Sequence, residues 1–155
     1  MVAMQLGELW AGLLGAVVGA IVGGAATLFA SLIVERQRMA RETRIRMYDE
    51  LVPAVLDGYL GYSASRSLQK ATAESEEFER RIRDLERASV IAGRKDHALT
   101  RDLIDVLIAR EFAAYQATKK GASESDILVT DLFVHQRAFN SKARRLQAYL
   151  ADKIR

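Results

Sequence analysis

The chain has 155 residues, with 23 Lys and Arg, 20 Asp and Glu, and a formal net charge of +3. It has no cysteine, which excludes disulfides and thiolate chemistry, and only one proline. Acidic and basic residues alternate, which does not fit a nucleic-acid-binding protein, because such proteins usually carry a strong basic face with interleaved aromatic residues.

The first predicted element is a long apolar helix. Residues Leu9 to Val34 form a run of 26 residues without Asp, Glu, Lys or Arg. Roughly 20 apolar helical residues cross the hydrocarbon core of a membrane, which is about 30 Å thick. Twelve residues of the run are Leu, Ile, Val or Phe, and together they favour insertion by roughly 4 to 7 kcal/mol. We therefore predict a transmembrane helix over 9–34, preceded by a short extracytoplasmic segment over 1–8.

Two other interpretations of this run are less favourable. A buried helix of a soluble core usually has an uncharged stretch of only about 10 to 14 residues. A cleaved signal peptide needs positive charge before its apolar run, whereas here only Glu8 comes before and the arginines come after. We expect the run to remain as an anchor.

A cluster of arginines follows the run and predicts its orientation. Lys and Arg within about 15 to 20 residues of a span stay on the cytoplasmic side, and they suit anionic lipid head groups. We expect a single-pass protein of the plasma (inner) membrane, with its N-terminus outside and residues 35–155 in the cytoplasm. The residues assigned to orientation and to lipid head groups are Arg36, Arg38, Arg41, Arg44 and Arg46.

Small residues gather on one side of the predicted membrane helix. At about 100° per residue they share one arc, and the large apolar side chains lie on the opposite arc. The predicted packing face consists of Gly12, Gly15, Ala16, Gly19, Ala20, Gly23, Ala26 and Thr27. Small residues let two helix backbones approach closely in lipid. Because there is one span, the partner helix must belong to another chain, in a homo-oligomer or a larger membrane complex. The alternative is that Gly and Ala are simply common in membrane helices.

The remaining residues, about 120, suffice for one domain and predict an all-α, antiparallel helical bundle. Apolar residues at helical spacing predict helices over about 35–70, with a kink near Pro53, and over 76–92, 97–119 and 124–153. Before and after the kink, Ile45 and Tyr48 recur at helical spacing with Val52 and Val55. The residues predicted to face inward from the later helices include Leu103, Leu107, Phe112, Tyr115, Leu128 and Leu132.

Several residues predict how these helices end and meet. Gly93 should end one helix before a short connector over 94–96, and Gly121 should end another. Ser123 with Asp126 resembles a capping box at the start of the last helix. A second series of small residues predicts a close helix crossing; it consists of Ala54, Gly58, Gly61 and Ser65.

No motif predicts catalysis or a cofactor. A phosphate-binding loop needs GxxxxGK after a strand, and no lysine occurs before Lys70. A di-iron bundle site needs Glu-x-x-His, and neither His97 nor His135 has Glu three residues earlier. A zinc site would need an unusual carboxylate-rich shell. The sequence therefore predicts no enzyme, no metal, no cofactor, no nucleic-acid partner and no evident small-molecule substrate.

Two functions are compatible with these features. The first is a non-enzymatic, membrane-anchored scaffold or accessory subunit, whose span packs with other helices and whose bundle docks a cytoplasmic partner. The alternative is a membrane-perturbing effector or holin-like oligomeric pore, although the span offers only Thr27 and Ser31 to line a water path. An enzyme whose site forms only with another chain also remains open. The layout is similar to that of many small bacterial membrane proteins, without a family motif that would transfer a function.

Overall fold

The computed structural model describes residues 2–67, 73–130 and 134–155, and within these ranges it does not place the side chains of 2–18, 21, 64–67, 124 and 128. The chain divides into two compact units, Met1–Arg38 and Met39–Arg155. Every element in the described ranges is a helix, and no strand occurs there. The predicted all-α class is confirmed.

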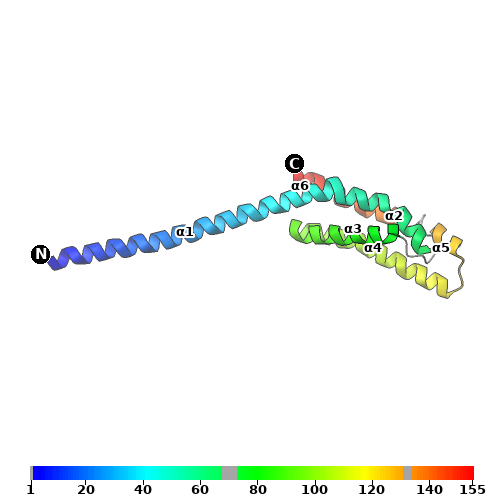
Figure 1. Cartoon of the computed structure of the whole chain (residues 1–155), viewed down its shortest axis with the longest axis horizontal. Coiled ribbons are helices and arrows are strands. Elements are labelled where there is room, and N and C mark those ends of the chain that lie inside the picture. The colour runs from blue at the N-terminus through cyan, green and yellow to red at the C-terminus, as the bar shows by residue number, and fades with distance from the viewer. Residues whose placement is uncertain (1, 68–72, 131–133) are drawn as a thin grey trace. The chain divides into compact units, whose positions relative to one another are not determined.

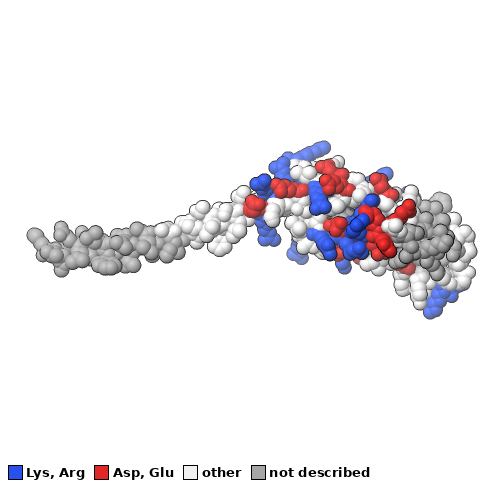
Figure 2. All heavy atoms as spheres, viewed as in Figure 1, with Lys and Arg blue, Asp and Glu red and all other residues white. Residues whose placement is uncertain are grey.

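Helix α1 spans Val2–Arg46. Its residues up to Arg38 belong to the first unit, and its last turns belong to the second. From Gly19 to Val34, every side chain that the structure places is exposed. Val22 is 62% exposed and Phe29 is 68% exposed. Figure 2 shows this part of the helix without charged residues. Within the described residues, no helix has an apolar stretch long enough to cross a membrane. The transmembrane assignment therefore stays a prediction.

The second unit is a bundle of antiparallel helices. After the end of α1, its elements are η1 (Met47–Leu51), α2 (Val52–Ser67), α3 (Ala73–Ala92), α4 (Arg94–Lys119), α5 (Glu124–Thr130) and α6 (Gln136–Ile154). Helix α2 contacts α3, α3 contacts α4, α4 contacts α6, and α6 returns to contact α2. Figure 1 shows that successive long helices of this unit run in opposite directions. This arrangement is consistent with the predicted bundle.

The bundle begins with a distortion that Pro53 explains. Pro53 has no N–H to donate to the carbonyl of Asp49, and its ring crowds that carbonyl. Just before it, η1 is a π-helix in which the N–H of Val52 donates to the carbonyl of Met47. The kink predicted at Pro53 takes the form of this wider turn, after which α2 restarts as a regular helix.

The π-turn also changes which side chains face the core. Met47 and Leu51 are buried, whereas Ile45 and Tyr48 are exposed. Helical spacing grouped Ile45 and Tyr48 with Val52 and Val55, but only Val52 and Val55 are buried. A uniform helical period does not hold through a turn that contains an extra residue.

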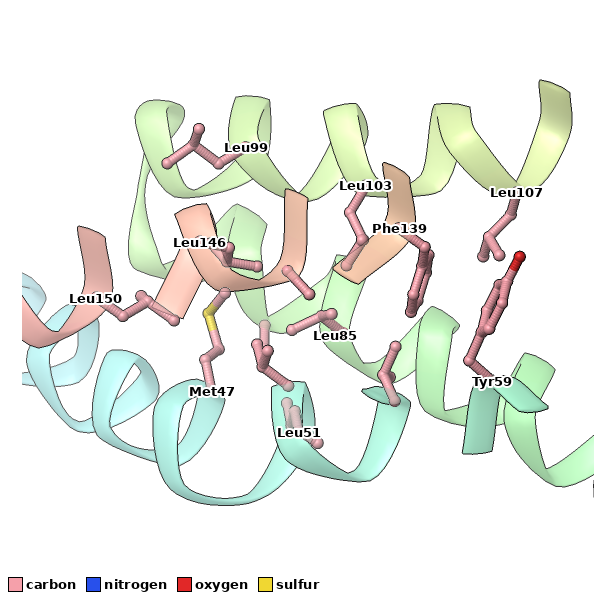
Figure 3. Packing of buried hydrophobic residues seen from close by; sticks show 14 of the residues in the cluster. Met47, Leu51, Tyr59, Leu85, Leu99, Leu103, Leu107, Phe139, Leu146 and Leu150 are labelled. Atoms are coloured by element: carbon pink, nitrogen blue, oxygen red, sulfur yellow. The ribbon is translucent and has the colours of Figure 1, made fainter. Parts of the chain in front are cut away.

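Four aromatic rings pack together in the core. The ring of Tyr59 stacks on Phe139 with 4.3 Å between centroids, and Tyr62 stacks on Phe78 at 4.5 Å. Leu85 on α3 and Leu103 on α4 are fully buried beside this cluster (Figure 3). Side chains from α2, α3, α4 and α6 thus share one core, and their burial is the main stabilising term of the bundle.

Glycines set the close approaches and the turns. A Cβ added at Gly58 would lie 3.0 Å from Cδ2 of Phe78, and one at Gly61 would lie 3.1 Å from Glu74 Oε2. The predicted close crossing of α2 is therefore confirmed for these two glycines, whereas the side chain of Ser65 lies outside the described residues. Gly93 ends α3 with φ of 144°, a value that side chains disfavour.

Helix α4 has different limits from those predicted. It begins at Arg94, so the predicted connector over 94–96 is helical and Gly93 alone makes the turn. At its other end, Gly121 has φ of 80°, its N–H donates to the carbonyl of Thr118, and Ala122 N–H donates to Ala117. These bonds form a Schellman motif and confirm the predicted stop.

The last predicted helix, 124–153, is described as two elements. Helix α5 ends at Thr130, residues 131–133 lie outside the described residues, and residues 134–135 form a π-type turn before α6. The predicted cap is present at the start of α5, because the N–H of Asp126 donates to Ser123 Oγ over 3.2 Å. The predicted inward positions Leu128 and Leu132 fall outside the described side chains.

Candidate interaction surfaces

The predicted packing face of α1 is open along its described part. Gly12, Gly15 and Ala16 lie outside the described side chains. Its other members are exposed; they are Gly19, Ala20, Gly23, Ala26 and Thr27. A Cβ added at Gly19, Gly23 or Gly24 would meet no described atom within 4 Å. The Cβ of any other residue at these positions therefore meets no steric obstacle from the described part of this chain.

The two polar side chains of this stretch bond within their own helix. Thr27 Oγ1 donates to the carbonyl of Gly23 over 2.8 Å, and Ser31 Oγ donates to the carbonyl of Leu28 over 2.8 Å. Hydroxyls bonded in this way need no water, so they are compatible with a lipid environment.

The five predicted arginines have different surroundings. Arg36 and Arg38 are exposed at the end of the first unit. In the second unit, Arg41 Nη2 donates to the carbonyl oxygen of Ile154 over 3.3 Å, and Arg46 Nε lies 3.5 Å from Glu50 Oε2. Arg36, Arg38, Arg41 and Arg46 thus remain on the surface, as a contact with lipid head groups requires.

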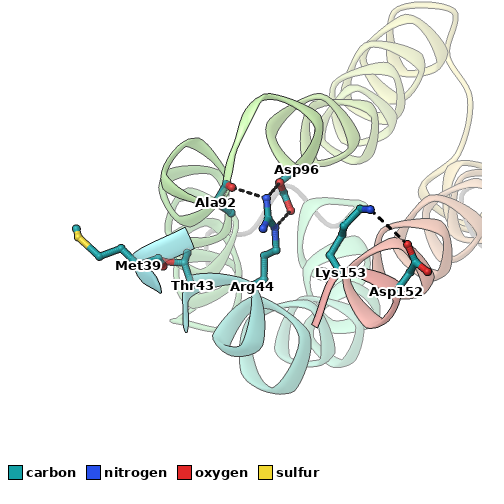
Figure 4. A network of polar contacts seen from close by, with 7 residues as sticks. All are labelled: Met39, Thr43, Arg44, Ala92, Asp96, Asp152 and Lys153. Carbon is teal, nitrogen blue, oxygen red and sulfur yellow. Dashed lines mark hydrogen bonds and ion pairs between the residues drawn. The ribbon is translucent and has the colours of Figure 1, made fainter. Parts of the chain in front are cut away.

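Arg44 is the exception, because its guanidinium lies between helices of the bundle. Its Nε and Nη2 donate to Oδ1 and Oδ2 of Asp96, both over 3.0 Å, and Nη2 also donates to the carbonyl of Ala92 over 2.7 Å (Figure 4). Hydrogen bonding to Asp96 raises the pKa of Arg44, against the opposing effect of burial. The side chain of Asp96 is buried and that of Arg44 is 22% exposed. Arg44 therefore has a structural role, because it links the end of α1 to the turn between α3 and α4.

A stripe of apolar side chains covers the outer face of α4. It consists of Ile108, Phe112 and Tyr115, which are all exposed. The prediction that Phe112 and Tyr115 lie in the core was therefore wrong. They follow each other at helical spacing, but the inner face of α4 at this level is occupied by Arg110.

Arg110 is a buried cation that joins α4 to α2. Its Nη1 donates to Glu111 Oε1 over 2.6 Å, and its Nη2 donates to the carbonyl of Ser63 over 2.8 Å. The guanidinium also lies 5.6 Å from the centroid of the Tyr62 ring, and the Tyr62 hydroxyl donates to Glu111 over 2.9 Å. Sequence reasoning missed this residue because arginine is usually exposed.

A small cavity lies beside Arg110, between α4, α5 and the start of α6. Its volume is about 100 Å³, and alanine methyl groups of α4 make much of its wall, with Ile127 and His135 opposite. The described residues contain no group of three or more His, Cys, Asp or Glu side chains placed to hold a metal. Asp126 and Thr130 also line it; among the described hydrogen bonds none joins either residue to His135, and we assign no chemistry to the cavity.

Comparison with known protein families, curated proteins and solved structures finds no match to this chain.

Proposed function

We propose that this chain is a non-enzymatic interaction subunit anchored in the plasma (inner) membrane. The carrying observation is that the described side chains of α1 from Gly19 to Val34 are exposed around the whole helix and almost all apolar. A helix that is apolar on every side needs lipid or other helices around it. In the sequence the uncharged run covers Leu9 to Val34, which is long enough for a helix that crosses a lipid bilayer.

In this proposal the helix assembles with helices of other chains through its small-residue face. The open space over Gly19 and Gly23 supports this role, because a second backbone can approach there without displacing a side chain. Thr27 and Ser31 bond to their own helix, which leaves no polar side chain of this stretch to line a water path. We therefore favour a packing helix over a pore.

The bundle is the part that docks a partner in the cytoplasm. Its support is the stripe of Ile108, Phe112 and Tyr115, since a row of large exposed apolar side chains on one helix is a common protein-binding surface. Arg36 and Arg38, which directly follow the apolar run, orient the chain with the bundle on the cytoplasmic side.

A matched pair of substitutions tests the assembly. Gly19→Leu places a large side chain on the packing face, whereas Gly24→Leu places the same side chain ~140° away around the helix. A Cβ at either position meets no described atom within 4 Å, so a difference between the variants points to a contact with another chain. We expect Gly19→Leu to reduce the assembled mass in mild detergent, measured by light scattering after size exclusion, and Gly24→Leu to leave it unchanged. Equal behaviour of the two variants would contradict the packing role.

The sequence contains no cysteine, so cysteine labelling can test the proposed membrane location and orientation. Single cysteines introduced before Leu9 and after Arg46 can be labelled in intact cells with a membrane-impermeant maleimide. We expect labelling only at the N-terminal position. Labelling of both positions, or release of the chain from membranes at high salt, would contradict a single-pass anchor with this orientation.

A further inference from the structure

Three segments that are distant in sequence meet at one end of the bundle. Arg44 bonds to the carbonyl of Ala92 and to Asp96, which lie on either side of the turn between α3 and α4. Arg41 donates to the carbonyl of Ile154, at the end of α6. The last turns of α1, the α3–α4 turn and the end of α6 thus form one surface, part of which is seen in Figure 4. We call it the entry end, because the chain enters the second unit there.

The entry end combines apolar and basic side chains. Val90 and Ile91, in the last turn of α3, are both exposed. The basic residues exposed at this end are Arg41, Arg94, Lys95, Lys153 and Arg155, and the exposed acidic residues are Glu42 and Asp152. Lys153 is 3.6 Å from Asp152, and Lys95 lies 4.9 Å from the centroid of the Tyr149 ring. Basic residues therefore outnumber acidic ones around two exposed apolar side chains.

This combination is typical of surfaces that bind the interface of an anionic membrane. Apolar side chains enter the boundary between head groups and acyl chains, and Lys and Arg remain among the head-group phosphates. Each basic residue near such a surface adds attraction that falls off within a Debye length, about 8 Å at physiological salt.

Chain length keeps the entry end close to the membrane in which we propose that residues 9–34 lie. Only Glu35 to Arg38 separate Val34 from Met39. A fully extended chain gains at most about 3.6 Å per residue, so Met39 lies within roughly 18 Å of Val34 in any conformation. The connection therefore keeps the entry end within reach of the bilayer.

We infer that the entry end is a second membrane contact, in which Val90 and Ile91 insert beside Arg94 and Lys95 into an interface of anionic phospholipid. This inference rests on the proposed anchor. The binding partner is the phosphate of lipid head groups, and the contact would hold the bundle against the bilayer.

The chain offers a matched pair of reporter positions. Ile91 is 57% exposed and Ile108 is 58% exposed, so a label at either residue starts from a similar exposure to water. Ile108 lies about 22 Å from the α3–α4 turn along α4, at ~1.5 Å per residue, whereas Ile91 lies next to that turn. Ile91→Cys and Ile108→Cys can each be labelled selectively with an environment-sensitive fluorophore, because the chain has no other cysteine. Leu28→Cys serves as a reporter for the anchor itself.

The labelled full-length chains are reconstituted into vesicles of phosphatidylcholine alone or with about one third phosphatidylglycerol. We expect the label at position 91 to shift to shorter wavelength and to be quenched by lipids with a spin label near the head group, only in the anionic vesicles. The label at position 108 should not respond. Arg94→Gln together with Lys95→Gln, or high salt, should remove the response at position 91.

The result at position 28 separates the two proposals. If the label at position 28 is quenched by lipid while position 91 does not differ from position 108, the inference is overturned and the anchor stands. If position 28 remains in water, both fail. A response at position 91 that is equal in neutral and anionic vesicles would also overturn the inference, because it would not depend on head-group charge.

Discussion

Replacement of Arg44 by methionine tests whether the buried ion pair holds the bundle together. Methionine keeps most of the length and the apolar stem of arginine, but it removes both hydrogen bonds to Asp96 and the bond to the carbonyl of Ala92. The carboxylate of Asp96 then stays buried without this cation. Removal of one partner from a buried pair costs about 3 to 5 kcal/mol. Because Arg44 is 22% exposed, water reaches part of the site, and we expect a loss near the lower end, about 3 kcal/mol.

The matched control is Arg46→Met, two residues later on the same helix. Arg46 is 63% exposed and lies 3.5 Å from Glu50, so its removal should cost at most about 0.5 kcal/mol. A double variant, Arg44→Met with Asp96→Leu, removes both buried charges and should recover much of the loss. Recovery would show that the cost comes from the unpaired carboxylate and not from lost packing.

Urea unfolding of the full chain in mild detergent measures these differences. All five tyrosines lie in the second unit, so tyrosine circular dichroism follows the bundle. Hydrogen bonding to Asp96 raises the pKa of Arg44 above its ordinary value, so the stabilisation is complete below the ordinary pKa of arginine and is lost only as the pH rises through the raised pKa. The difference between wild type and Arg44→Met should therefore be the same at neutral and mildly alkaline pH. A cost below about 1 kcal/mol, or one equal to that of Arg46→Met, would refute the reasoning.

Three further substitutions test the core by the same unfolding measurement. Phe139→Ala removes a fully buried ring stacked on Tyr59 at 4.3 Å and should cost about 3 to 5 kcal/mol; a cost under ~1 kcal/mol would contradict the packing described. Gly58→Leu forces a side chain against Phe78, which a Cβ alone would meet at 3.0 Å, and should cost about 1 to 3 kcal/mol, whereas an unchanged midpoint would argue against the close crossing. Thr100→Val replaces a buried hydroxyl that has no hydrogen-bond partner among the described residues and should leave stability equal or raise it by up to ~1 kcal/mol; a marked loss would mean that this hydroxyl has a partner.

Local signals in the sequence were sufficient for the helices and several of their ends. Gly93 and Gly121 end helices as expected, since their φ values of 144° and 80° are ones that other residues disfavour. The close crossing at Gly58 and Gly61 was also predictable, because small residues at helical spacing leave room for another helix. These features depend on a few neighbouring residues, which a single sequence displays directly.

Features that depend on distant partners could not be predicted in this way. Arg44 and Asp96 are 52 positions apart, and nothing near Arg44 distinguishes it from Arg41 or Arg46, which stay on the surface. Most arginines are exposed, so no local signal marked Arg110 as a buried residue; it is buried on α4, whereas Phe112 is exposed. Pro53 predicted a distortion of the helix. It did not predict that a π-turn before it would change which side chains face the core.

The sequence also contains a local pattern that matches the entry end. Val90 and Ile91 are adjacent, so they lie ~100° apart on a helix and cannot both face one narrow core. They precede Gly93, Arg94 and Lys95. An apolar pair that a helix cannot bury together, followed by a glycine turn and two basic residues, indicates an exposed tip with affinity for an anionic surface.

The two exposed apolar surfaces of the bundle differ in the charged residues around them. Val90 and Ile91 lie next to Arg94 and Lys95, whereas the nearest basic side chains that follow the stripe of Ile108, Phe112 and Tyr115 along α4 are Lys119 and Lys120. The exposed residues between the stripe's members include Ala109 and Ala113, which are small and uncharged. Arg83 of α3 lines the same pocket as Ile108, together with Glu79 and Glu111, so basic residues are not in excess there. Such a surface gains little from anionic lipid, but it can bury area against another protein. Along α4 the centre of the stripe is about 28 Å from Gly93, so the two surfaces are separate. This difference in charge supports the two proposals made above, lipid as the partner of the entry end and protein as the partner of the outer face of α4.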